Sequence, residues 1–228
     1  MALRTVRRVA RFFGPRTLWF CVADNHLHQV VEAEPAEVSL LRRNLDFVLR
    51  GLTGQRFDLR FKPVEEQSHL LSCWPYVRGN REHHGLLANE GSGIADIVGA
   101  RLVPGFDPRR WERHIPRRTL AGMLEAVDFP GIEPMPKAEV RAHGSTALVR
   151  AAAGAIGWPE IESNLRVMVH ARAAAIHIAG QAGIAAGEIR HALGISRSTA
   201  HRLGTRRDPA LEEGILRRLA FDRVTGTR

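Results

Sequence analysis

The sequence predicts an α+β domain over residues 1–103, a proline-rich connector with short helices over 104–158 and a helical module over 159–228. Three observations predict this organisation. Strand and helix patterns alternate along the first hundred residues, six prolines crowd the start of the connector, and helical patterns alone follow it. The sequence therefore predicts a mixed N-terminal domain followed by an all-helical C-terminal module.

The first elements follow from residue type and spacing. Residues 17–32 are β-branched and aromatic on both sides of a polar Ala-Asp-Asn segment. They predict either two strands joined by a tight Asp24–Asn25 turn or one strand with a bulge. Residues 36–53 place leucines and valines on one helical stripe that ends near Gly51 and Gly54. A strand pair followed by an amphipathic helix is therefore expected.

The next elements are a strand and several helices. The alternating stretch RFDLRFKPV, residues 56–64, predicts a strand, and residues 65–80 predict a helix. Pro75 should kink that helix, because proline has no backbone N–H to donate. Within the connector we expect a helix at 117–127 and further helical structure around 144–155.

The charge of the chain indicates an anionic partner. The 228 residues carry a formal net charge of +9, and residues 141–228 hold 13 basic against seven acidic side chains. This bias favours nucleic acid and a basic C-terminal module. The basic first 16 residues predict a helix or, alternatively, an organelle transit peptide. Two cysteines and no apolar run of membrane-spanning length predict a cytoplasmic protein without membrane contact.

A helix-turn-helix pattern lies near the C-terminus. It comprises a helix near 186–193, a tight turn at Gly194–Ile195, a cap at Ser196 and a second helix near 197–203. The outward side chains of the second helix are of types that reach phosphates and base edges. These side chains are Arg197, Ser198, Thr199, His201 and Arg202. The pattern predicts DNA binding, and a generic helical hairpin is the alternative.

Two further segments carry residues with chemical potential. His26 and His28 are two positions apart, so in a strand both imidazoles face one side and could bind one metal ion. Tyr76 is the only tyrosine, and Asn80 lies one helical turn after it. A tyrosine hydroxyl can attack a phosphodiester that a divalent cation polarises. The alternatives are two half-exposed strand histidines and a buried, structural tyrosine.

Taken in order, these segments resemble the single-tyrosine HUH transposases of small bacterial insertion sequences, especially the REP-associated tyrosine transposase branch. That family shows an Asn-His-hydrophobe-His strand, an Arg-Phe-Lys strand, and a helix with Tyr and Asn four residues apart. The residues that match are Asn25, His26, Leu27, His28, Arg60, Phe61, Lys62, Tyr76, Val77, Asn80, Gly85 and Leu86. Some family members also append a C-terminal helix-turn-helix.

The resemblance implies an incomplete ferredoxin-like transposase domain, because the family's first strand and most of its first helix precede the part matched here. It implies Tyr76 as the nucleophile that forms a 5′-phosphotyrosyl intermediate in cleaving and rejoining single-stranded DNA. His26, His28 and Asn80 would hold Mg²⁺ or Mn²⁺, because an amide oxygen and no thiolate complete the set.

The expected partners are single-stranded or hairpin DNA at the N-terminal domain and duplex DNA at the C-terminal module. A homodimer is an open alternative. A different class of function also remains open, namely a non-catalytic DNA-binding protein or transcriptional regulator on a degenerate transposase scaffold.

Overall fold

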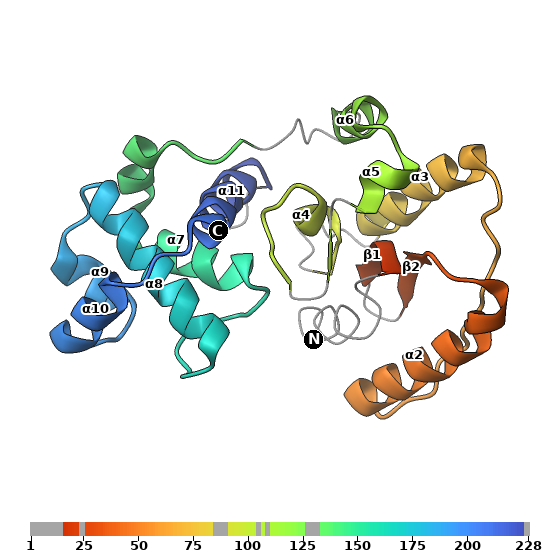
Figure 1. The fold of residues 1–228 in the computed structure, drawn as a ribbon, viewed down its shortest axis with the longest axis horizontal. Coiled ribbons are helices and arrows are strands. Elements are labelled where there is room, and N and C mark those ends of the chain that lie inside the picture. The colour runs from red at the N-terminus through yellow and green to blue at the C-terminus, as the bar shows by residue number, and fades with distance from the viewer. Residues whose placement is uncertain are drawn as a thin grey trace. The chain divides into compact units, whose positions relative to one another are not determined.

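The structure is a computed structural model that describes residues 16–22, 26–83, 91–103, 106–107, 110–125 and 133–225. The chain divides into two compact units. One consists of Met1–Gly93 with Pro104–Arg117, and the other of Ile94–Val103 with Arg118–Arg228. Within the described residues the first unit holds the strands, and the second consists of helices and their connections (Figure 1). The protein is therefore a mixed α and β chain that is mostly helical.

Two antiparallel strands form the sheet of the first unit. β1 (Thr17–Val22) and β2 (Leu27–Val31) pair in a register that sets Cys21 opposite His28, with a bulge near the start of β1. The two-strand alternative of the prediction is therefore confirmed, and residues 23–25 lie outside the described part of the chain. Both strands are rich in β-branched and aromatic side chains, which pack well on a pleated surface.

The other edge of β1 is also paired. The backbone N–H of Val22 donates to the Gly91 carbonyl at 3.0 Å, and that of Gly93 donates to the Phe20 carbonyl at 2.9 Å. Between these bonds Ser92 forms an antiparallel bridge with β1. β1 thus has hydrogen-bond partners on both sides, which fits the burial of all six of its residues.

A long amphipathic helix, α2 (Val38–Thr53), covers one face of the hairpin. It follows a short 3-10 turn at Pro35–Glu37 and ends at Gly54, whose φ of 74° is in the left-handed region that glycine tolerates. Three leucines of the helix form a buried cluster, against which Leu27 and Val31 of β2 pack. The leucines are Leu41, Leu45 and Leu49. The predicted apolar stripe is confirmed.

The stretch 56–64 is not a strand, so that prediction is wrong. Residues 55–65 run without regular structure, and no strand pairs with them among the described residues. Their alternation has another cause: Phe57 and Leu59 pack against the leucine cluster of α2, whereas Arg56 and Asp58 are exposed. Alternation reports burial on one side, which packing on a helix provides as well as a sheet does.

The helix α3 (Gln67–His83) continues through Pro75 as one element. It packs on β1, where the ring centroids of Trp74 and Trp19 lie 4.4 Å apart. A short helix, α5 (Trp111–His114), is joined to its start, because the Gln67 side-chain amide donates to the His114 carbonyl at 2.7 Å. The first unit therefore places α3 against β1 through an aromatic pair.

Three long helices make up most of the second unit, namely α7 (Lys137–Ala155), α8 (Arg166–Gln181) and α11 (Pro209–Thr225). The shorter helix α10 (Arg197–Gly204) packs on α8. α7 and α11 pack on each other and on α8, and buried alanines on α7 and α8 let the helices approach closely. α7 breaks at Gly144, where φ is 79°. α7 falls in the predicted connector but packs as part of this core.

Residues 94–103 contribute a buried ion pair to the second unit. After the short helix α4 (Ile94–Ile97), the Arg101 guanidinium binds the Asp96 carboxylate, with Nε 3.0 Å from Oδ1 and both side chains fully buried. Burial raises the pKa of the Asp96 carboxyl, and the Arg101 charge opposes that rise. Removing either partner would leave an uncompensated charge in the core.

The remaining elements are helical. The helix α6 (Arg117–Glu125) lies within the predicted 117–127 helix. α9 (Ala186–Ala192) precedes α10. Of the helices in the described ranges, none combines the length and the apolar character needed to cross a membrane.

Candidate functional site

The helices α9 and α10 lie where the sequence predicts them. Gly194 adopts a φ of 62° in the turn between them, and the Ile195 N–H donates to the Arg190 carbonyl at 3.1 Å. Ser196 begins α10, since its hydroxyl accepts a hydrogen bond from the Thr199 N–H at 3.2 Å. A left-handed glycine and a serine cap fix the turn from both sides.

The buried side of the pair rests on the second unit. Ile189 and Leu193 are buried on the α9 side, and Leu203 on α10. α10 packs on α8, where Gly204 lies near the Ile176 side chain. Arg190 lies at a position where the helix-turn-helix pattern usually has a small residue. Its side chain folds back along α9, and its Nε donates to the Ala186 carbonyl at 3.1 Å. The arginine is thus accommodated without opening the pair.

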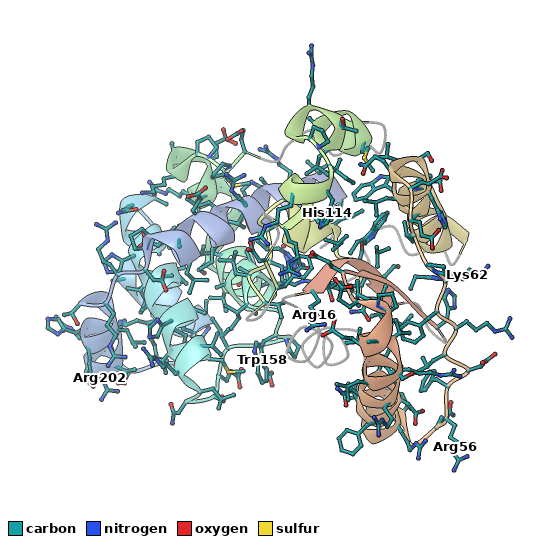
Figure 2. All side chains as sticks on the ribbon, turned by 45° about the vertical axis from the view of Figure 1, so that its right-hand side comes forward. Arg16, Arg56, Lys62, His114, Trp158 and Arg202 are labelled. Carbon is teal, nitrogen blue, oxygen red and sulfur yellow. The ribbon has the colours of Figure 1, made fainter. Side chains whose placement is uncertain are left out.

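The outward side of α10 is polar and basic. Arg197, Ser198, His201 and Arg202 are exposed, and Figure 2 labels Arg202 on this helix. Thr199 is half-buried, and both its hydroxyl and its backbone N–H contact the Ser196 hydroxyl. Four of the five predicted contact residues are therefore exposed to solvent.

Arg206 lies just after the end of α10 and was not among the predicted contacts. It is exposed in the segment between α10 and α11, next to Arg207, whose Nη2 lies 3.4 Å from the carboxylate of Glu212. Among the described residues, neither Arg197, Arg202 nor Arg206 has an acidic partner. The Thr-Arg-Arg sequence after the second helix is the signal that could have indicated Arg206.

The predicted histidine pair lies at the start of β2. The ring centroids of His26 and His28 are 4.9 Å apart with an interplanar angle of 75°, and both residues are half-buried. His28 faces Cys21 across the hairpin, and Trp19 lies two residues before Cys21, so all three share one face of the sheet. This is the face on which α3 packs through Trp74.

The predicted nucleophile and amide ligand lie on α3. The backbone of Tyr76 and Asn80 is helical, and their side chains lie outside the described part of the structure. Asn80 follows Tyr76 by four positions, about one helical turn along α3.

The two imidazoles alone do not make a magnesium site. The described residues contain no group of three histidine, cysteine or acidic side chains able to hold a metal ion. Mg²⁺ and Mn²⁺ prefer oxygen ligands, whereas imidazole nitrogens suit Zn²⁺, Cu²⁺, Fe²⁺ and Ni²⁺ better. The two imidazoles therefore fit the predicted Mg²⁺ or Mn²⁺ only in part, and the oxygen ligand depends on Asn80.

Comparison of the chain with protein-family models, with curated proteins and with solved structures gives no match. Two places therefore carry the functional evidence, namely the basic outer side of α10 and the histidine pair on the α3 side of the hairpin.

Proposed function

We propose that the chain is a DNA-binding protein whose second unit contacts duplex DNA through α10 and the segment after it. The observation that carries the proposal is the outer side of α10. It presents Arg197, Ser198, His201 and Arg202 on a helix whose other side is anchored by Leu203. A helix held in this way behind a tight turn is the arrangement that enters a major groove.

The roles of these side chains follow from their chemistry. The guanidinium groups of Arg197, Arg202 and Arg206 have no acidic partner among the described residues, so phosphates would supply the missing anions. Ser198 and His201 have shorter polar side chains, which suit contacts to base edges and sugar. The turn at Gly194 and the Ser196 cap fix the angle between α9 and α10, and so set the direction in which α10 points.

The test is the salt dependence of duplex binding. Because the target is unknown, a pool of random duplexes is first enriched for binders to the unmodified protein. Changing Arg197→Gln and Arg202→Gln together should weaken binding and reduce the slope of log K against log salt by about 2, since each phosphate contact contributes about 0.9. The matched control is Arg141→Gln with Arg150→Gln, two exposed arginines of α7. Equal losses in both pairs would refute the proposal.

A second candidate function is metal-dependent cleavage and rejoining of single-stranded DNA. The specific observation in its favour is that the two imidazoles lie together on the side of the hairpin where α3 packs. On this candidate β1 and β2 would be two strands of a ferredoxin-like transposase domain. It ranks second because the side chains of Tyr76 and Asn80, on which it depends, lie outside the described part of the structure.

In that chemistry the Tyr76 oxygen gives up its proton and attacks a backbone phosphorus, and the bond to the 3′ oxygen breaks. The products are a 5′-phosphotyrosine and a free 3′ hydroxyl, and the reverse attack rejoins the strand. His26, His28 and Asn80 would hold the Mg²⁺ or Mn²⁺ ion, which supplies charge neutralisation at the phosphate.

The discriminating experiment uses labelled single strands, Mn²⁺ and a denaturing gel. Cleavage predicts a covalent adduct with the unmodified protein and none with Tyr76→Phe, which keeps the ring and removes the attacking oxygen. A non-catalytic DNA-binding protein gives no adduct with either, while enriched duplexes still bind. Several unrelated strands, including hairpins, are used, so that the comparison does not depend on one sequence.

A further inference from the structure

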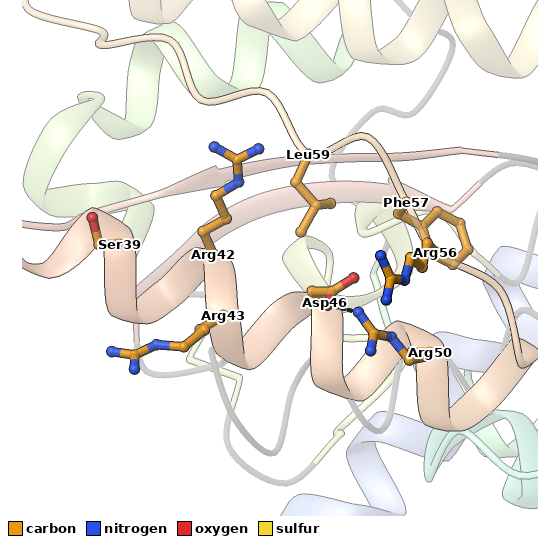
Figure 3. Close-up of a pocket in the computed structure, with 8 residues that line it drawn as sticks. All are labelled: Ser39, Arg42, Arg43, Asp46, Arg50, Arg56, Phe57 and Leu59. Carbon is orange, nitrogen blue, oxygen red and sulfur yellow. Dashed lines mark hydrogen bonds and ion pairs between the residues drawn. The ribbon is translucent and has the colours of Figure 1, made fainter.

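A basic groove crosses α2 and the extended segment that follows it in the first unit. Figure 3 shows side chains of α2 facing the segment that carries Arg56, Phe57 and Leu59. The residues that line the groove are Ser39, Arg42, Arg43, Asp46, Arg50, Arg56, Phe57 and Leu59. Four arginines and a single carboxylate thus line the groove, which gives it an excess of positive charge.

Most of this positive charge is not neutralised within the protein. Asp46 is bound by Arg50 one turn later on α2, with Nη2 2.5 Å from Oδ2. Arg42, Arg43 and Arg56 are exposed, and none of them has an acidic partner among the residues that the structure describes. Three guanidinium groups therefore remain available, spaced over two chain segments, as a polyanion would require.

An exposed aromatic ring stands beside one of these arginines, Arg43. Phe47 is 77% exposed and lines a second shallow depression with Arg43, Asn44, Asp46 and Arg50. Three of these residues also line the groove, so the two hollows form one continuous surface. The Phe47 ring is not part of the core, because the side of α2 that packs against the hairpin is the one that carries the leucine cluster.

We propose that this surface of α2 binds single-stranded nucleic acid, with phosphates on Arg42, Arg43 and Arg56 and an unpaired base stacked on Phe47. Stacking on an aromatic ring needs a base whose face is free, and duplex DNA hides the faces of its bases. The combination of a basic track with an exposed ring therefore selects a single strand. The inference does not depend on the α10 proposal, which concerns another unit and a duplex ligand.

The stacking contact is tested with a labelled oligothymidylate of about 20 nucleotides, which has little secondary structure. Binding is followed by fluorescence anisotropy in the Arg197→Gln, Arg202→Gln background, so that α10 contributes little. Phe47→Leu and Phe47→Ala should each weaken binding about tenfold, because both remove the aromatic face. Leu40→Ala is the matched control, since Leu40 is 52% exposed on the same helix but has no ring. Its affinity should change less than about twofold.

The phosphate contacts are tested by the salt dependence. Changing Arg42, Arg43 and Arg56 to Gln together should lower the slope of log K against log salt by about 2, at about 0.7 per contact for a single strand. The control removes three exposed arginines of the second unit, Arg141, Arg150 and Arg166. Equal slopes for the two triple variants, or unchanged affinity for Phe47→Leu, would overturn the proposal.

An anionic membrane surface is the competing partner, because Leu40 and Phe47 lie on one side of an arginine-bearing helix. Vesicles of phosphatidylcholine with phosphatidylglycerol measure this outcome by co-sedimentation. If Leu40→Ala and Phe47→Ala both reduce vesicle binding while oligothymidylate affinity is unchanged, the single-strand proposal is wrong. The proposal is supported if Phe47→Ala weakens oligothymidylate binding and Leu40→Ala does not. All variants should keep the far-ultraviolet circular dichroism of the parent, because the changed side chains are exposed.

Discussion

Both units of this protein display arginines on a helix, and the two helices differ in what stands beside those arginines. α10 carries Arg197 and Arg202 among short polar side chains, and none of its own residues is a large exposed hydrophobic group. α2 carries Arg42 and Arg43 next to Phe47, the most exposed of the large hydrophobic residues in the described ranges. The same charged residue type is thus combined with two different neighbours.

The two proposals assign a different ligand to each helix because of this difference. Short polar groups and arginines match phosphates and base edges, which a duplex presents in its major groove. An aromatic ring matches the face of a base, which only an unpaired strand presents. The two helices are also held differently: the eight residues of α10 bury only Leu203, whereas α2 buries Leu41, Leu45, Val48 and Leu49. The position of α10 should therefore be the more easily disturbed.

The largest effect is expected for Leu203→Ala. Leu203 is 3% exposed, and its truncation should cost about 2–5 kcal/mol in the free energy of unfolding of the second unit. Urea unfolding measures the loss, with Val224→Ala, 53% exposed, as the control. Duplex binding should fall while oligothymidylate binding persists. A parallel fall in both affinities would mean that the two ligands share one surface.

The reciprocal change is Leu45→Ala. Leu45 lies in the leucine cluster of α2 and is 8% exposed, so its truncation should cost about 2 kcal/mol, near the lower end for a leucine. Oligothymidylate binding should weaken, because the helix that carries Phe47 loses its anchor, whereas duplex binding is kept. Unaltered oligothymidylate affinity after a measured loss of stability would contradict the role given to α2.

The sequence predicted the elements whose signals are local. The stripe of α2, the glycine turn and the serine cap before α10 are each encoded within a few residues, and the structure has them where they were expected. Features that depend on distant partners were missed. Ser92 pairs with β1 although its Gly-Ser-Gly surroundings carry no strand signal, and 56–64 alternates without being a strand.

The candidate sites divide in the same way. The outer residues of α10 could be read from one segment, because a single helix presents them. The groove on α2 could not, since Arg42 and Arg56 meet only when the extended segment packs back on the leucine cluster. For the predicted metal and tyrosine site, the structure brings His26 and His28 together, and the approach of Tyr76 and Asn80 to them stays a prediction.

A smaller effect is expected for the cap of α10. Ser196→Ala removes the oxygen that accepts from the Thr199 N–H and should cost about 1 kcal/mol in unfolding free energy. Ser198→Ala is the matched control, because Ser198 is exposed and the contact of its hydroxyl in the described part of the chain is with the Ser196 hydroxyl, 3.0 Å away. If α10 is held as weakly as its single buried leucine indicates, Ser196→Ala should also weaken duplex binding. Equal stability of the two alanine variants would show that the cap contributes nothing.

The smallest effect concerns the start of α2 and depends on pH. The Glu37 carboxylate accepts hydrogen bonds from the Arg16 guanidinium at 2.5 Å and from the Glu34 N–H at 3.1 Å. These bonds lower the pKa of Glu37 below its usual value, with Arg16 as the larger cause. A carboxylate with a lowered folded-state pKa stabilises the protein above its unfolded pKa, and this stabilisation is lost as the pH falls through the folded pKa.

The stability difference between the parent protein and Glu37→Gln should therefore be present at neutral pH and shrink on acidification, as urea titrations at a series of pH values would measure. Glu65→Gln is the control, because Glu65 is exposed and has no bonded partner among the described residues. Its effect should stay small at every pH. A Glu37→Gln difference that does not change with acidification would mean that this ion pair leaves the stability of α2 untouched. The leucine cluster would then be the contact that holds α2 in place.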